Sequence, residues 1–170
     1  MAGRGVFFAI DDQTVKNLSA LEPANRVDFV LNDIEDNFFE NAPEYTCETD
    51  KAWDAIHRSL TDGFLYWKNG KYPLNHVILG GQVLYGEKDD EDDFLIVMKD
   101  KKQVQDVAKS LQSFSDDDFK KGYAQINIED YEYQLGFEDL EYSLSWFDNV
   151  KVFWQKAAAE NLNIIFTCDL

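Results

Sequence analysis

The chain has 170 residues, of which 45% are hydrophobic and 15% aromatic, so it can fill one substantial core and is not a disordered chain. Its 33 acidic and 16 basic residues give a formal net charge of −17, which disfavours binding to nucleic acid or to anionic membranes. The first ten residues lack the pattern of a signal peptide, and no later run has the length of a membrane-spanning helix. We therefore expect a soluble, cytoplasmic protein.

The first forty residues predict one strand followed by helices. Residues 5–10, GVFFAI, form a short apolar run that is typical of a buried strand. Asp12 is suited to capping a short helix, and Pro23 to opening the next one. In residues 24–40 apolar side chains recur at helical spacing, which predicts a long amphipathic helix with an acidic outer face. Its expected inner residues are Val27, Val30, Leu31, Ile34 and Phe38.

The middle of the chain predicts a loop, a helix and a turn. Residues 41–48 contain Pro43 and no periodicity, which indicates a loop, and Thr49 or Asp50 is placed to cap a following helix. One face of that helix carries Trp53, Ile56, His57 and Leu60. Residues 64–72 have an Asn-Gly pair typical of a turn. Residues 73–84 fit either a strand or a helix, and their pair Gly80-Gly81 predicts a sharp turn.

The second half of the chain gives clearer signals. After an acidic loop at 86–93, residues 94–98 read as a central strand, and Asp100 is placed to cap a helix. Ser115 and Asp118 predict a capping box that opens a shorter helix. Residues 127–137 look irregular, and 138–160 form the longest helical candidate, with Asn161 as its C-terminal cap. A final strand is expected at 162–168.

These elements predict an α+β fold for a single domain covering residues 1–170. A strand at each end of the chain and another near its middle, separated by unequal helices, do not make a regular series of βαβ units. The expected architecture is a small mixed β-sheet packed against several α-helices. Parallel neighbours stay possible wherever a helix separates two strands.

The chain offers few candidates for catalytic or metal chemistry. Cys47 and Cys168 fit neither a disulfide framework nor a zinc site and are expected to be buried small residues. We find no nucleophile motif, no phosphate loop and no calcium loop, and we predict no metal, no cofactor and no catalytic residue. The rare side chains gather in one stretch, which defines a candidate pocket. It comprises Trp53, Asp54, His57, His76, Gly80 and Gly81. The alternative is that both histidines are core residues.

Four segments resemble the YfbM-like family, a bacterial family of domains of unknown function. They are DKAWDAIHRSL at 50–60, PLNHVILGG at 73–81, FLIVMKDKKQVQDVAKSL at 94–111 and FWQKAAAENLNIIFTCDL at 153–170. The opening G-x-F-F-A-I also fits, so the resemblance spans nearly the whole chain. It implies a single α+β domain and no established reaction. The family's patterns match at Asp50, Lys51, Trp53, Asp54, Ile56, His57, Pro73, Leu74, Leu79, Gly80 and Gly81.

The acidity and the aromatic loops favour a non-catalytic binding protein. Our first hypothesis is an immunity protein that neutralises a toxin effector with a basic surface, because tyrosine and tryptophan anchor tight interfaces and an acidic field speeds encounter with a basic partner. The candidate partner-binding residues are Tyr66, Trp67, Tyr72, Asp89, Asp90, Glu91, Asp92, Asp93, Tyr131 and Tyr133. The second hypothesis is a small-molecule binder or enzyme that uses the pocket around His57, and the third is a purely structural signature.

Overall fold

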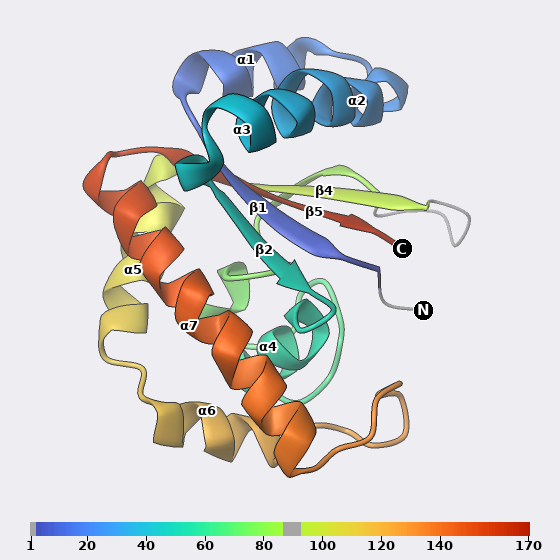
Figure 1. Ribbon diagram of the computed structural model, residues 1–170, viewed down its shortest axis with the longest axis vertical. Helices are drawn as coiled ribbons and strands as arrows, with labels where there is room; N and C mark the ends of the chain where they lie inside the picture. Colours follow the sequence, from blue (N-terminus) through green and yellow to red (C-terminus); the bar gives the residue numbers. More distant parts are fainter. Residues whose placement is uncertain (1–2, 87–92) are drawn as a thin grey trace.

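A computed structural model describes residues 3–86 and 93–170 of the chain (Figure 1). These residues form a five-stranded sheet with the strand order β2-β1-β5-β4-β3. The strands are β1 (Gly5–Ile10), β2 (Thr46–Asp50), β3 (Gln82–Tyr85), β4 (Phe94–Lys99) and β5 (Asn163–Asp169). The predicted acidic loop at 86–93 falls mostly on residues 87–92, which lie outside the described residues.

The two ends of the chain meet at the centre of the sheet. β1 and β5 pair along their whole lengths, from Gly5 opposite Cys168 to Ile10 opposite Asn163. Alternate side chains of β1 enter different cores, Phe7 on one face and Phe8 on the other, and both are fully buried. Burial on both faces explains why residues 5–10 read as an uninterrupted apolar run. The strand predictions for 5–10, 94–98 and 162–168 are confirmed.

The α+β class is confirmed, but the described strands all pair antiparallel, so the expected mixed sheet is corrected. The connection from β4 to β5 shows the reason. It contains two long helices that run antiparallel, since Gln105 contacts Ala158 while Gln112 contacts Gln155. After β4 the chain reverses direction into α5, reverses again into α7 and reverses a third time into β5. Strand β5 therefore lies antiparallel to β4.

Helices cover both faces of the sheet (Figure 1). On one face lie α1 (Asp12–Ala20), α2 (Pro23–Phe29), the π-helical segment η1 (Val30–Glu35) and α3 (Asp36–Asn41). The other face holds α4 (Trp53–Leu60), α5 (Lys101–Gln112), α6 (Asp116–Tyr123) and α7 (Phe137–Ala159), and short 3₁₀ turns occur at Pro43–Tyr45 and Leu74–His76. The larger core lies on this second face, between the sheet and α4 to α7.

Local signals placed most helices correctly. Asp100 and Ser115 each form the predicted capping box, and the expected inner stripe of α5 is buried. Residues 23–41 are helical throughout, although the wide turn of η1 rotates Leu31 outward from the expected inner face. The cap of α1 is Asp11 rather than Asp12, because the Asp11 carboxylate accepts from the Thr14 amide at 2.8 Å.

The strand β2 replaces part of the predicted loop at 41–48. Thr49 and Asp50 belong to this strand and do not cap α4, which begins at Trp53 without a side-chain cap. The Thr49 hydroxyl instead donates to the carbonyl of Gly5 at 2.8 Å. Pairing with β1, which local sequence does not reveal, fixes this segment as an edge strand.

Candidate functional site

The helix α4 is buried along its whole length, and His57 lies sealed within it. Its Nε2 contacts two acceptors, Asn69 Oδ1 at 2.8 Å and the Tyr66 carbonyl at 3.2 Å, so this nitrogen carries the proton. The bare Nδ1 is buried and has no hydrogen-bond partner among the described residues. Burial lowers the pKa of His57 to about 4, because protonation of Nδ1 would place a charge in the core.

Trp53 and Asp54 also make structural contacts. The Trp53 indole is buried and donates from Nε1 to the carbonyl of Gly3 at 2.8 Å. Asp54 forms a buried ion pair with Arg58 at 2.5 Å. Arg58 continues to Asp130, with 2.8 Å between its Nη1 and the carboxylate, and so ties α4 to the loop that precedes α7.

His76 and the glycine pair shape the chain's return to the sheet. The His76 ring is half-buried and meets Tyr72 edge-on, with 4.9 Å between ring centroids. A Cβ at Gly80 would come within 2.5 Å of the Asn75 carbonyl, and Gly81 has a φ of +126°. The predicted sharp turn is thus present, and only glycine fits it without strain. None of the six residues of the candidate pocket lines the cavity of about 720 Å³ that is described below.

Both histidines lie near Lys99, whose charge adds to burial in lowering their pKa values. Lys99 is itself fully buried, donates to the carbonyl of Ile78 and lies 5.5 Å from the centre of the Phe166 ring. Burial lowers its pKa well below the usual value. Burial thus shifts all three basic groups, His57, His76 and Lys99, towards their neutral forms.

The cysteines do not provide a nucleophile. Cys47 and Cys168 are buried and free, as expected, and burial raises the pKa of each thiol to about 12. A thiol with that pKa stays protonated at neutral pH and reacts slowly. Within residues 3–86 and 93–170, no three His, Cys, Asp or Glu side chains converge as a metal site would require.

The candidate partner-binding residues come from different segments of the chain. Tyr66 and Tyr72 are exposed, and Trp67 is half-buried and packs on the larger core. Tyr131 and Tyr133 belong to the loop before α7, where Tyr131 is buried. Asp93 is exposed, whereas Asp89, Asp90, Glu91 and Asp92 lie outside the described residues. Their role in binding stays a prediction.

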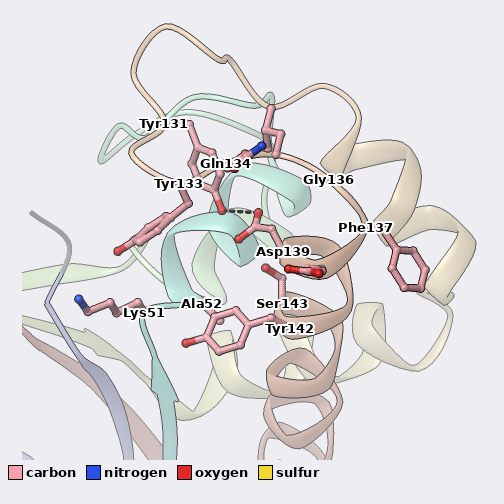
Figure 2. A pocket seen from close by; sticks show the side chains of 12 residues that line it. Lys51, Ala52, Tyr131, Tyr133, Gln134, Gly136, Phe137, Asp139, Tyr142 and Ser143 are labelled. Carbon is pink, nitrogen blue, oxygen red and sulfur yellow. Dashed lines mark hydrogen bonds between the residues drawn. The ribbon is translucent and has the colours of Figure 1, made fainter.

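A cavity lies where the loop before α7 meets the end of β2. It has a volume of about 720 Å³, and Figure 2 shows Tyr131 reaching towards Asp139 of α7, with Tyr133 beside it on the same loop. We call it the tyrosine cavity. Its lining residues are Lys51, Ala52, Tyr131, Tyr133, Gln134, Leu135, Gly136, Phe137, Glu138, Asp139, Tyr142 and Ser143. Only Tyr131 and Tyr133 among them were named as site candidates from sequence.

Asp139 organises one wall of the tyrosine cavity. Its Oδ2 accepts from the Tyr123 hydroxyl at 2.6 Å and from the Tyr131 hydroxyl at 2.8 Å (Figure 2 shows the second bond). Burial, together with this carboxylate, raises the pKa of Tyr123 to about 12 and that of Tyr131 further. Both phenols therefore stay protonated and hold the Asp139 side chain in place.

Two hydroxyls at the cavity are unpaired. Ser143 is fully buried on α7, and neither its Oγ nor the buried Oη of Tyr133 has a hydrogen-bond partner among the described residues. In Figure 2 the Ser143 hydroxyl points from α7 towards the side on which Tyr133 and Lys51 lie. Tyr142, by contrast, donates to Asp50 Oδ2 at 2.7 Å. Buried hydroxyls usually find partners, so this pair indicates a place for a ligand group.

The electrostatic environment at Tyr133 is negative. Burial is the first cause that raises its pKa, and the charges of four nearby carboxylates raise it further. These are Asp54, Glu132, Asp50 and Asp139. The α7 helix begins after Gly136, which offers no side-chain cap, and the first turn holds Glu138 and Asp139. Its helix dipole is thus already matched by the chain's own acids.

The fold defines an α+β domain in which helices cover both faces of an antiparallel sheet, with a cavity beside the start of its longest helix. A family model for a domain of unknown function, DUF1877, matches residues 1–167, and the chain belongs to that family. The chain is also similar to the crystal structure of YfbM, a protein of unknown function from Escherichia coli, with 17% identity and a TM-score of 0.60. That match covers 97% of this chain and 99% of the other.

These comparisons confirm the YfbM-like resemblance found in the sequence, and at 17% identity the structural match shows the fold alone. The search of curated proteins returned no match. Among the described helices, none is long and apolar enough to cross a membrane.

Proposed function

We propose that the chain is a non-catalytic binding protein that neutralises a toxin effector by direct contact, as immunity proteins do. The observation that carries this proposal is a pair of exposed apolar side chains, Ile128 and Phe137, of which Phe137 lines the tyrosine cavity. Ile128, in the loop before α7, is 74% exposed, and Phe137, the first residue of α7, is 77% exposed. Large apolar side chains surrounded by polar groups are typical anchors of protein interfaces.

Charge indicates the kind of partner. The formal net charge of −17 accelerates encounter with a basic protein and opposes contact with phosphate backbones. Around the two apolar anchors, Glu129, Asp130 and Glu138 are exposed carboxylates. We therefore infer a partner with a basic surface around an apolar patch. The proposed role assigns the protein to the cytoplasm of the cell that makes the toxin.

The proposal is tested with the proteins encoded next to this gene. Each purified neighbour is titrated with the chain by calorimetry, and cells that express each neighbour are scored for growth with and without the chain. We expect one neighbour to be toxic and to be neutralised by binding. If no neighbouring product binds or is neutralised, the immunity role is wrong.

Matched variants locate the contact. Phe137→Ala and Ile128→Ala should each weaken binding about tenfold or more, because interface anchors cost at least 1–2 kcal/mol when truncated. Val152→Ala is the control, since Val152 is 71% exposed on α7 but lies about four helical turns from Phe137. Equal losses in all three variants would contradict the assigned surface.

A further inference from the structure

We propose that the tyrosine cavity binds the ammonium or guanidinium group of a lysine or arginine side chain that the protein partner inserts. That the cation comes from a protein partner rests on the proposed function, whereas the preference for an organic cation rests on the residues of the cavity itself. Phe137, which lines the cavity, would then contact the partner surface around the inserted side chain.

The cavity has the size and walls for such a group. Its volume of about 720 Å³ lies within the range of ligand pockets. Figure 2 shows Tyr133 and Tyr142 on opposite sides of an opening, while the Phe137 ring points away from it towards solvent. Aromatic faces attract ammonium and guanidinium groups, and a long aliphatic stem can pack between them.

The unpaired hydroxyls lack partners that a cation would supply. Ser143 Oγ and Tyr133 Oη are buried and can each accept a hydrogen bond. Ammonium and guanidinium groups carry donors only, so they match these two oxygens. Asp139 can accept further hydrogen bonds. Both phenols donate to its Oδ2, whereas a carboxylate can accept about four hydrogen bonds in all.

The charges at the cavity favour a cation over an anion. Among the twelve lining residues, Lys51 is the only basic residue, whereas Glu138 and Asp139 are acidic. Figure 2 shows the Lys51 ammonium at the edge of the group, directed away from Asp139. An anion at the start of α7 would meet the two carboxylates of the first turn, although helix N-termini otherwise favour anions.

The preference is tested with small probes that reproduce the two side-chain ends. Ethylguanidinium and n-butylammonium are titrated into the whole protein, with n-butanol as the neutral analogue and acetate as the anion. Two-dimensional NMR follows the backbone amides of Tyr133, Asp139 and Ser143. We expect saturable shifts at these positions with both cations, with dissociation constants on the order of 1–10 mM for such small molecules. Equal binding of n-butanol, or binding of acetate alone, would overturn the inference.

Two variants remove one acceptor each. Tyr133→Phe and Ser143→Ala should each weaken cation binding about three- to tenfold, the loss expected for one hydrogen bond. Both variants delete a hydroxyl that has no partner, so folding should be retained. Tyr45→Phe and Ser113→Ala are the controls, because these side chains do not line the tyrosine cavity, and they should leave cation binding unchanged. Unchanged binding in Tyr133→Phe and Ser143→Ala would contradict the assigned site.

The same variants separate this inference from the proposed function. If a toxin binds in a Phe137-dependent way but Tyr133→Phe and Ser143→Ala bind it with full affinity, the cavity does not receive a partner side chain and the inference is wrong. If the cations bind at the cavity but no neighbouring toxin does, the immunity role fails and the site instead serves free amines.

Discussion

The helix α4 and the walls of the tyrosine cavity both hold buried polar atoms without hydrogen-bond partners among the described residues, but only those of the second group belong to residues that line the cavity. His57 Nδ1 lies in a fully buried helix, whereas the buried Ser143 Oγ and Tyr133 Oη belong to residues that line a cavity of about 720 Å³. An unpaired atom inside a packed core lowers stability and constrains protonation. An unpaired atom beside space can be satisfied by a ligand.

Arg58 connects these two regions. From α4 it contacts Asp54 on one side and both the carboxylate and the carbonyl of Asp130 on the other. Asp130 precedes the two tyrosines that form a wall of the cavity. The helix α4, where rare side chains gather, therefore holds the loop of the tyrosine cavity in place through Arg58 but contributes no lining residue.

The largest effect is expected from breaking this connection. Arg58→Met should lower the free energy of unfolding by about 3–5 kcal/mol, because it leaves Asp54 buried without its countercharge. Urea denaturation measures this loss, and NMR should show the loop before α7 losing order.

Two further variants test whether burial is the cause. Lys102→Met breaks another ion pair at the same helical spacing, but Lys102 is exposed, so the loss should stay below about 1 kcal/mol. The double variant Asp54→Asn, Arg58→Met should recover part of the stability lost with Arg58→Met alone. A loss at Arg58 no larger than that at Lys102 would show that the buried network does not support the cavity.

His57 should make the fold sensitive to acid. Its folded pKa of about 4 lies below the unfolded value of 6.5, so between these two pH values the unfolded chain binds the proton and the folded chain does not. Stability from this group is complete above pH 6.5 and decreases as the pH falls, by about 3 kcal/mol near pH 4. Denaturation curves over this range measure the decrease.

The variant His57→Gln, which does not titrate, should flatten the curve. His76→Gln serves as the comparison and should flatten it less, since His76 is half-buried and its pKa is lowered to a lesser degree than that of the sealed His57. Parallel curves for the wild-type protein and His57→Gln between pH 6.5 and pH 4 would show that the ring is not sealed.

Local signals in the sequence predicted much of the fold. The capping boxes at Asp100 and Ser115 need only side chains three residues apart, and the runs at 5–10 and 94–98 are apolar enough to specify buried strands without knowledge of their neighbours. Strand β2 was missed because it alternates polar and buried residues at an edge and is defined by pairing with β1.

The site was less predictable, because it joins residues that are far apart in the chain. The loop tyrosines Tyr131 and Tyr133 were singled out by their type, but Lys51, Asp139 and Ser143 reach the cavity only through the packing of β2, the loop and α7. A serine inside a long helix gives no local sign that its hydroxyl lacks a partner.

The smallest effect should come from the cavity's own hydroxyls. Tyr133→Phe and Ser143→Ala should leave the free energy of unfolding unchanged or raise it by up to about 1 kcal/mol, because each removes a buried group that makes no hydrogen bond. Tyr131→Phe is the matched comparison and should lower it by about 1.5–3 kcal/mol, because that phenol donates to the Asp139 carboxylate. Urea denaturation of the three variants measures these differences. A loss for Tyr133→Phe as large as that for Tyr131→Phe would mean that the Tyr133 hydroxyl is already satisfied within the fold, and the distinction between a sealed core and an open site would no longer hold.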